Sequence, residues 1–304
     1  MVTSTAPAFP STTCPAWGRG WCAALACRLE ATARKPGNVH PQAEFADLSH
    51  AELVAAGGAI APALESAHLR PLGRTILEAV AASRALTRSN ANLGIVLAVA
   101  PLAAVPNPAD LCPERIAAVL EPLGPQDARD IWQAIAIARP GGMGRQDRWD
   151  LAEAPPPSIF TAMRAAAGRD QIARLWTNGY GPLFDGLVRD IVDELQAGRP
   201  LGDAIVRAYL LQLSRAPDSL VGRKHGDAVA ATVSARAADV LAAGPSGWVE
   251  AAAGFDRWLR SGGINPGTTA DLVAAALYIL ATTGRLRDLV GHQPGIESIV
   301  AGNA

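Results

Sequence analysis

The near absence of strand-forming patterns is the feature that most constrains the fold of this 304-residue chain. Alternation of β-branched or aromatic residues with polar ones is hard to find. Alanine dominates, apolar residues recur at helical spacing, and the connections are short and marked by Pro and Gly. The sequence therefore predicts an all-α protein of ten or more helices. They are expected at about residues 17–33, 51–66, 72–87, 93–104, 114–120, 127–138, 160–177, 183–197, 201–214, 223–243, 247–260 and 269–283.

Two of these helices carry a recognisable start signal. Ser49 and Glu52 have the spacing of a capping box, in which side chain and backbone at the helix start bond reciprocally. Thr268 and Asp271 repeat the pattern before the last long helix. Both pairs are therefore predicted to cap.

The composition excludes several classes of protein. Hydrophobic residues make up 49% and charged residues 18% of the chain, which is enough for a sizeable core and too apolar for general disorder. A formal net charge of −1 gives no field that would recruit nucleic acid or an anionic membrane. The longest apolar runs, 93–105 and 272–281, fall short of the roughly 20 residues that a membrane span needs. We therefore expect no nucleic-acid or membrane partner, and the oligomeric state is open.

The domain organisation is expected to be simple. Residues 1–16 are rich in Thr, Ser, Pro and Ala without a basic region before an apolar run, which favours a disordered lead over a signal peptide. Residues 17–304 are predicted to form one helical domain, with the triple proline at 155–157 as the only candidate linker. The four cysteines lack metal-binding spacing and fit a reducing cytoplasm.

A turn at residues 35–41, Lys-Pro-Gly-Asn-Val-His-Pro, is the first of five polar interruptions, and Asp47 follows it. Two prolines and a glycine cannot continue the preceding helix. The chain has 27 Lys+Arg but only two lysines, Lys35 and Lys224. Where arginine is the usual cation, a retained lysine is typical of a compact charge at a phosphate. Solvated surface lysines are the alternative interpretation.

The second and third interruptions add amides and a glycine-rich loop. Asn90 and Asn92 open an apolar helix, where they could cap it or bind a base or ribose. Gly142 and Arg145 lie in a loop whose backbone N–H groups could approach phosphate oxygens. Asp147, close behind, favours a magnesium–phosphate site, since Mg²⁺ takes one or two carboxylates plus phosphate oxygens.

The last two interruptions lie in the C-terminal third. Asp218 is followed by Arg223 and Lys224, a set that could hold a metal, neutralise phosphates or form an ion-pair network. Gly263 and Thr268 precede a helix, whose N-terminus could bind an anion or simply be capped. The chain contains no Walker P-loop, nucleophile elbow or zinc signature.

Taken in order, these segments resemble the triphosphoribosyl-dephospho-CoA synthase family. The resemblance covers most of the chain after about residue 20, and it is the order of the motifs that is specific. The matching segments are Glu-Ala-Thr-Ala-Arg-Lys-Pro-Gly at 30–37, Asn-Ala-Asn-Leu-Gly at 90–94, Pro-Asp-Ser-Leu-Val-Gly-Arg-Lys-His-Gly at 217–226 and Gly-Ile-Asn-Pro-Gly-Thr-Thr-Ala-Asp-Leu at 263–272.

The resemblance implies an all-helical transferase that joins the triphosphoribosyl group of ATP to 3′-dephospho-CoA and expels adenine. On that reading, Mg²⁺ held by Asp47, Asp147 or Asp218 anchors the triphosphate. Lys35, Asp47 and Asp218 are the candidates for catalysis, and one of the three aspartates could instead act as general base. The further expected contacts with phosphate, base and ribose are Gly37, Asn38, Asn90, Asn92, Gly142, Arg145, Arg223, Lys224, Gly263 and Thr268.

One departure from the family keeps two alternatives open. Many members carry a Gly-x-His-x-Asp-Met pattern, whereas residues 43–48 read Ala-Glu-Phe-Ala-Asp-Leu, with Phe45 in place of the histidine. The first alternative is a ribosyl or nucleotide transferase acting on a one-carbon carrier of the pterin or methanofuran type. The second is a non-catalytic helical nucleotide-binding protein.

Overall fold

Helices form the whole framework of the part of the chain that the computed structural model describes, residues 17–87, 89–139 and 154–290. The β features in this part are two isolated bridges, His40–Ala43 and Phe45–Leu48, so the predicted all-α class is confirmed. The elements are α1 Arg19–Thr32, α2 His50–Ala59, α3 Ala61–Glu65, η1 Ala67–Leu69, α4 Leu72–Leu86, α5 Leu93–Ala103, η2 Pro108–Asp110, α6 Pro113–Leu120, α7 Pro125–Ala138, α8 Ile159–Ala166, α9 Gln171–Asn178, α10 Gly181–Leu183, η3 Phe184–Val188, α11 Arg189–Gln196, α12 Leu201–Arg215, α13 Ser219–His225, α14 Asp227–Ala242, α15 Gly244–Ser261, α16 Gly267–Thr282 and α17 Arg285–Val290.

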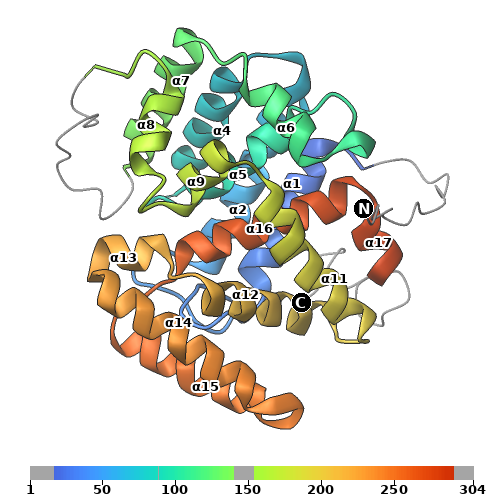
Figure 1. Cartoon of the computed structure of the whole chain (residues 1–304), viewed down its shortest axis with the longest axis vertical. Coiled ribbons are helices and arrows are strands. Elements are labelled where there is room, and N and C mark those ends of the chain that lie inside the picture. The colour runs from blue at the N-terminus through green and yellow to red at the C-terminus, as the bar shows by residue number, and fades with distance from the viewer. Residues whose placement is uncertain (1–16, 88, 140–153, 291–304) are drawn as a thin grey trace, which may run out of the picture.

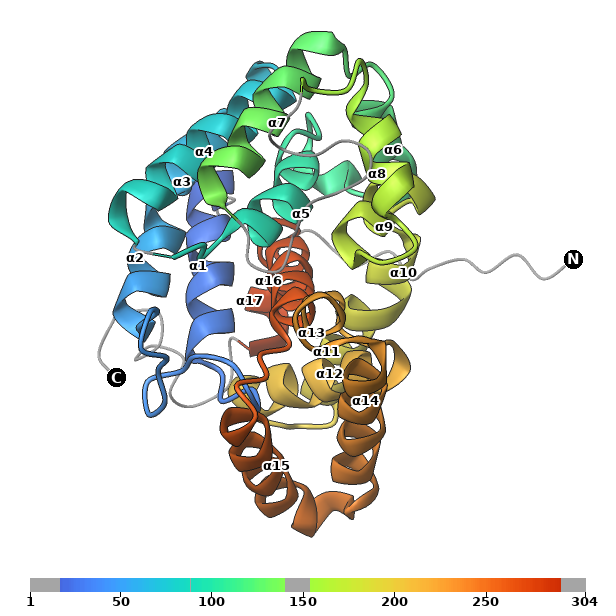
Figure 2. The same cartoon turned by 90° about the vertical axis from the view of Figure 1, so that its left-hand side faces the viewer.

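Helix α16 is the centre of the fold. Its sequence is almost entirely apolar or small, and all of its residues except Gly267 and Asp271 are buried. A helix that is apolar all round must be enclosed by others, and α16 packs against α1, α5 and α12. It lies between α1–α9 on one side and α11–α15 on the other (Figures 1 and 2). Loops that end near the first turn of α16 therefore meet in the middle of the molecule.

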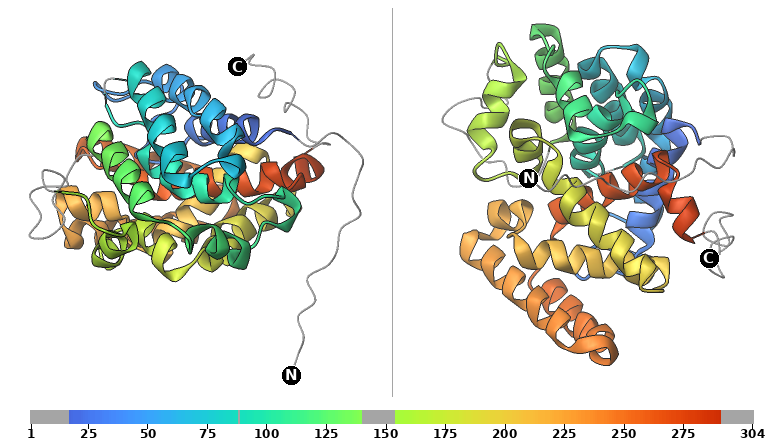
Figure 3. Two further views of the ribbon diagram at one scale, coloured as in Figure 1. Left: turned by 90° about the horizontal axis from the view of Figure 1, so that it is seen from above. Right: turned by 45° about the vertical axis from the view of Figure 1, so that its right-hand side comes forward.

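Helices α14 and α15 form a pair that projects from the rest of the body (Figure 3). Arg236 on α14 lies over the ring of Trp258 on α15, 4.2 Å from its centroid, which links the two helices. Helix α13 is separated from α14 by Gly226, whose φ of +89° is strained for any residue with a Cβ. This break leaves α13 beside the start of α16.

The predicted helices are largely confirmed, and the main errors are missed breaks. The segment 51–66 divides at Ile60, 160–177 divides before Asp170, and 223–243 divides at Gly226. Helix α17 was not expected. Apolar periodicity continues across each break, so the local φ at Gly226 and the cap at Asp170 decide the outcome instead.

The two predicted capping pairs have different outcomes. Ser49 Oγ accepts from Glu52 N at 3.1 Å and Glu52 Oε2 accepts from Ser49 N at 2.9 Å, so this capping box is confirmed. Helix α16 instead begins at Gly267 without a side-chain cap, and the capping prediction for Thr268 and Asp271 is wrong.

No described helix combines the length and the hydrophobicity that crossing a membrane would require. The predicted disordered lead at 1–16 lies outside the described residues and stays a prediction.

Candidate active site

A cavity of about 690 Å³ opens beside the first turn of α16. Its described wall combines an apolar side, contributed largely by α7, α8 and α9, with a charged side. The cations on the wall are Arg84, Arg139, Arg169, Arg223 and Lys224, and the carboxylates are Glu30, Asp47, Asp170 and Asp271. A pocket of this size, apolar in part and charged in part, is typical of a small-molecule site.

The Lys-Pro-Gly-Asn turn is rigid and locked to the helices around it. Asn38 N donates to Lys35 O at 3.1 Å, with Pro36 and a positive φ of 79° at Gly37, as in a type II turn. Tyr209 Oη donates to Pro36 O at 2.8 Å. Gly37 N donates to Asp256 Oδ1 at 2.8 Å. The turn thus holds the residues after it against the cavity.

Gly37 packs tightly against neighbouring segments and lies off the described cavity wall. A Cβ on Gly37 would lie 2.9 Å from both Leu259 Cδ1 and Pro266 Cδ. Its N–H is already used by Asp256, and the residue does not line the cavity. This geometry does not favour the phosphate contact predicted for Gly37, which stays a prediction.

Lys35 lies in a buried ion pair, and the structure does not bring it to the described cavity wall, where the sequence predicts a phosphate-binding catalytic residue. Its side chain is fully buried and pairs with Glu30 Oε1 at 3.0 Å. Its Nζ also donates to the carbonyl oxygens of Glu30 and Ala33. Lys35 is not part of the cavity wall. The charge that the sequence suggested for a ligand instead neutralises the buried Glu30 carboxylate, which does reach the wall.

Asn38 does line the cavity, as expected. Its Nδ2 donates to Asn265 Oδ1 at 2.6 Å, and Arg260 donates to its backbone oxygen. Its buried Oδ1 has no hydrogen-bond partner among the residues that the structure describes. An amide fixed on one side with an unused acceptor on the other suits a ligand-orienting role.

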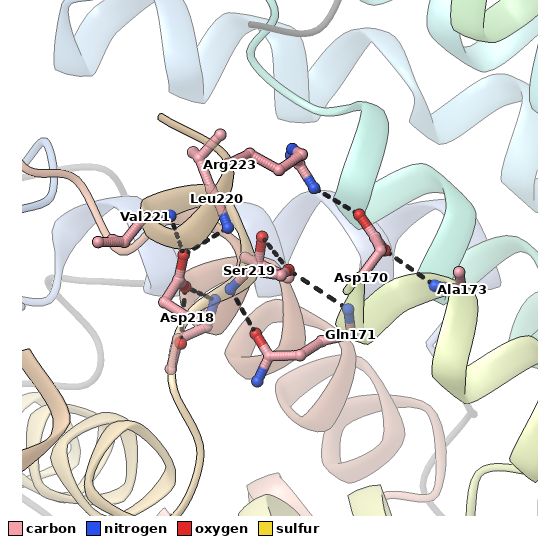
Figure 4. A network of polar contacts seen from close by, with 10 residues as sticks. Asp170, Gln171, Ala173, Asp218, Ser219, Leu220, Val221 and Arg223 are labelled. Carbon is pink, nitrogen blue, oxygen red and sulfur yellow. Dashed lines mark hydrogen bonds and ion pairs between the residues drawn. The ribbon is translucent and has the colours of Figure 1, made fainter. Parts of the chain in front are cut away.

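Asp218 holds helices α13 and α16 together (Figure 4). Its Oδ1 accepts from Leu220 N at 2.9 Å and Val221 N at 3.0 Å, which caps α13. Its Oδ2 accepts from Thr269 N at 2.7 Å and Thr269 Oγ1 at 2.8 Å. Burial raises the pKa of Asp218, and these hydrogen bonds oppose that rise.

The structure does not bring Asp218 to the described cavity wall, where its predicted roles as metal ligand or general base would be performed. The side chain is fully buried and absent from the cavity wall, and both oxygens are occupied by donors. A carboxylate with four donors has little to offer a metal or a substrate proton.

Arg223 and Lys224, by contrast, reach the cavity as expected. Arg223 pairs with Asp170, whose Oδ1 accepts from Ala173 N at 2.9 Å and so caps α9 (Figure 4). The starts of α9 and α13 are also joined by Ser219 N, which donates to Gln171 Oε1 at 3.1 Å (Figure 4). Lys224 is exposed and has no ion-pair partner among the described residues. Helix α13 therefore carries two cations at the cavity: Arg223, which Asp170 holds in place, and Lys224, which no described carboxylate pairs with.

The two asparagines before α5 differ. Asn90 lines the cavity, and its Oδ1 accepts from Leu93 N at 3.2 Å at the start of α5, while its predicted contact with a base or ribose stays a prediction. Asn92 is buried, is not part of the described cavity wall, and its Nδ2 has no hydrogen-bond partner among the described residues. Its predicted ligand contact stays a prediction.

The other predicted residues divide in a similar way. Gly263 and Thr268 line the cavity, although Ser219 Oγ already donates to Thr268 Oγ1 at 3.1 Å. Asp47 lines it and is exposed, with no hydrogen bond or ion pair to another described residue. Gly142, Arg145 and Asp147 lie outside the described residues. The part of the chain that the structure describes contains no group of three His, Cys, Asp or Glu side chains placed for a metal.

Asp271 is the wall residue whose role sequence reasoning missed. It is the one charged residue of α16, and it faces the cavity. Burial, then the nearby carboxylates Glu30, Asp218 and Asp170, raise the pKa of Asp271 well above its ordinary value, while Arg223 opposes them. The signal was present in the sequence: Asp271 is a single carboxylate in an otherwise apolar helix, where ionisable residues are uncommon.

The sequence profile of the ATP:dephospho-CoA triphosphoribosyl transferase family matches residues 16–289. The chain belongs to this family. The match spans every segment that forms the described cavity wall, so the protein is a transferase of the triphosphoribosyl-dephospho-CoA synthase type.

A solved structure supports the same assignment. The crystal structure of a candidate triphosphoribosyl-dephospho-CoA synthase from Archaeoglobus fulgidus is similar, with a TM-score of 0.60 and 25% sequence identity. The similarity covers 76% of this chain and 99% of that one. No protein of curated function matches the sequence significantly.

Proposed function

We propose that this transferase moves the triphosphoribosyl group of ATP onto a hydroxyl of 3′-dephospho-CoA and releases adenine. The observation that carries the proposal is the convergence of the family's separate segments on one cavity, where cations and carboxylates meet. A polyanion and a departing base need both kinds of group, whereas simple nucleotide binding needs fewer fixed charges.

Arg223 and Lys224 are the proposed partners of the triphosphate. Asp170 fixes the guanidinium of Arg223, so little side-chain freedom is lost when a phosphate binds. Lys224 adds a mobile point charge. Asn38 and Asn90 are placed to orient the ribose or the base, since each presents an amide on the wall.

Mg²⁺ is the proposed companion of the triphosphate, and Asp47 is the predicted ligand that fits. Its carboxylate lies on the cavity wall and is not committed to any described partner. Mg²⁺ usually takes one or two carboxylates plus phosphate oxygens, so the lack of a three-residue cluster among the described residues is compatible with this role. When bound, the ion would neutralise phosphate charge.

The apolar wall is proposed to receive the uncharged parts of the substrates. Trp132, Ile135 and Met163 contribute to it, from α7 and α8. An adenine ring or the pantetheine chain of dephospho-CoA could bury apolar surface there. Free Cys22, Cys27 and Cys112 agree with a cytoplasmic location for the reaction.

The test is incubation of the purified protein with ATP, Mg²⁺ and 3′-dephospho-CoA, with free adenine followed by chromatography. Adenine release that requires dephospho-CoA is the expected result. Magnesium-dependent ATP binding without release, but with release when a pterin or methanofuran-type acceptor is added, would move the assignment to a one-carbon carrier. Phe45, which replaces the family histidine, lines the cavity and is the first position to examine in that case.

A further inference from the structure

The carboxylate of Asp271 is pressed against the first turn of α5. A Cβ built on Gly94 would lie 2.0 Å from Asp271 Oδ2 and 2.5 Å from its Cγ, a separation that real atoms do not adopt. Glycine leaves room for the carboxyl group at this position, and any larger residue would require the Asp271 side chain to move. The two helices are therefore shaped around Asp271 so that it sits on the cavity wall.

This carboxyl group has no hydrogen-bond or ion-pair partner among the described residues. The charged groups that act on it are Glu30 on α1, Asp170 before α9, Asp218 before α13, and Arg223 on α13. Burial, and then the three carboxylates among these four groups, raise the pKa of Asp271 well above its ordinary value. The carboxyl group therefore holds its proton to higher pH than a solvated aspartate does.

The reaction proposed above needs a proton donor at the departing base. The C1′–N9 bond of ATP breaks and a C1′–O bond to the acceptor hydroxyl forms. Adenine leaves far more readily when a ring nitrogen such as N7 gains a proton as the bond breaks. The acceptor hydroxyl loses one proton, so the complete reaction neither consumes nor releases protons once the donor has been recharged.

We propose that Asp271 is the catalytic acid that donates this proton to the departing adenine, an inference that rests on the proposed function. The acceptor hydroxyl releases its own proton to water, and Asp271 is reprotonated from solvent. The other carboxylates on the described wall are less suited: Lys35 pairs with Glu30, Arg223 pairs with Asp170, and Asp47 is exposed to solvent.

The test compares Asp271→Asn with the wild type on two substrates. Asparagine matches the shape of aspartate beside Gly94 but cannot donate an acidic proton. With ATP, we expect kcat to fall by about 100-fold or more. With N7-methylated ATP, whose base already carries a positive charge and leaves without protonation, we expect a loss below about tenfold. The spontaneous release of the methylated base is subtracted.

Two controls keep the outcomes distinct. Asp239→Asn, an exposed change on α14, should leave both rates unchanged, and magnesium-dependent ATP binding by Asp271→Asn should persist. An equal loss on both substrates would overturn the acid role. A metal ligand, a general base or a purely structural residue would be needed whether or not the departing adenine carries the methyl group. Failure of the wild type to release adenine from ATP would instead refute the proposed function, and the inference with it.

Discussion

Asp218 and Asp271 both lie at the first turn of α16, and their surroundings differ completely. Four donors from α13 and α16 reach the two oxygens of Asp218, whereas no described donor reaches Asp271. Burial raises the pKa of both carboxyls. Hydrogen bonds oppose the rise at Asp218, and neighbouring carboxylates add to it at Asp271.

The comparison separates two kinds of polar group in one protein. Asp218 and Lys35 are bound by partners within the fold, and Asp218 joins segments that are far apart in the sequence. Asp271 and Asn38 Oδ1 lie on the cavity wall without a partner among the described residues, which leaves them available to a ligand. Changes at the first kind should mainly reduce stability, and changes at the second kind mainly activity.

Lys35→Ala should have the largest effect. It leaves the Glu30 carboxylate buried without its cation, which costs about 3–5 kcal/mol of unfolding free energy. Urea denaturation followed by circular dichroism measures this loss. Lys224→Ala, the exposed counterpart, should change stability by less than about 0.5 kcal/mol. Equal stability of the two variants would contradict the structural role of Lys35.

Asp218→Ala should rank next. It removes the cap of α13 and leaves Thr269 Oγ1 and several N–H groups without their acceptor, a loss of about 2–3 kcal/mol. The same denaturation experiment applies, with Asp239→Ala on the exposed face of α14 as the control. If the variant were as stable as the wild type but had lost magnesium-dependent ATP binding, Asp218 would have to be interpreted as a metal ligand.

Gly94→Ala should reduce activity while the fold persists. The new Cβ would occupy the position of the Asp271 carboxylate, so we expect kcat/KM to fall by about tenfold or more, equivalent to ~1.4 kcal/mol. Steady-state kinetics of adenine release measure it. Gly58→Ala is the matched control, because nothing lies within 4 Å of its Cβ position on α2. Full activity in Gly94→Ala would show that Asp271 does not need its present position.

Lys224→Ala should have the smallest of these effects. Loss of one exposed cation from the cavity wall should raise the KM for ATP by roughly tenfold and leave kcat nearly unchanged. The difference from the wild type should shrink as salt is added, since the contact is solvent-exposed. Arg189→Ala, an exposed change on α11, serves as control. An unaltered KM would remove Lys224 from the phosphate site.

Much of the fold could be predicted from sequence because apolar periodicity and capping are local signals. The loops that meet at the cavity were also found, since Gly, Pro and polar clusters interrupt that periodicity. Which side chain of each loop faces the ligand could not be predicted. Lys35 and Asp218 have the residue types of a phosphate or metal site, but their partners, Glu30 and Thr269, become apparent only when the segments pack.

Asp271 is the opposite case: the sequence pattern indicates a structural role, and the structure places the residue on the cavity wall. Its position four residues into a helix matched a capping pattern, and this local reading concealed its role. The contact with Gly94 joins residues 177 positions apart, so no local pattern could reveal it. The sequence shows the chemical type of each residue, but it does not show which partner the side chain binds in the fold.

The most direct test of this account is the pH dependence of the unfolding free energy of Asp271→Asn against the wild type. In the wild type, the unfolded state loses the Asp271 proton near pH 4, whereas the folded state keeps it to higher pH. Folding is therefore increasingly disfavoured as the pH rises from about 4 towards the raised pKa of the folded state. The variant lacks this penalty.

We predict that the two proteins have similar stability below pH 4 and that Asp271→Asn becomes the more stable one as the pH rises to 8, measured by urea denaturation at each pH. Such a result would show that the wild type holds the Asp271 carboxyl at a cost to its own stability, as expected for a group that serves a ligand. A variant less stable than the wild type at every pH would mean that Asp271 supports the fold as Asp218 does, and would contradict the account.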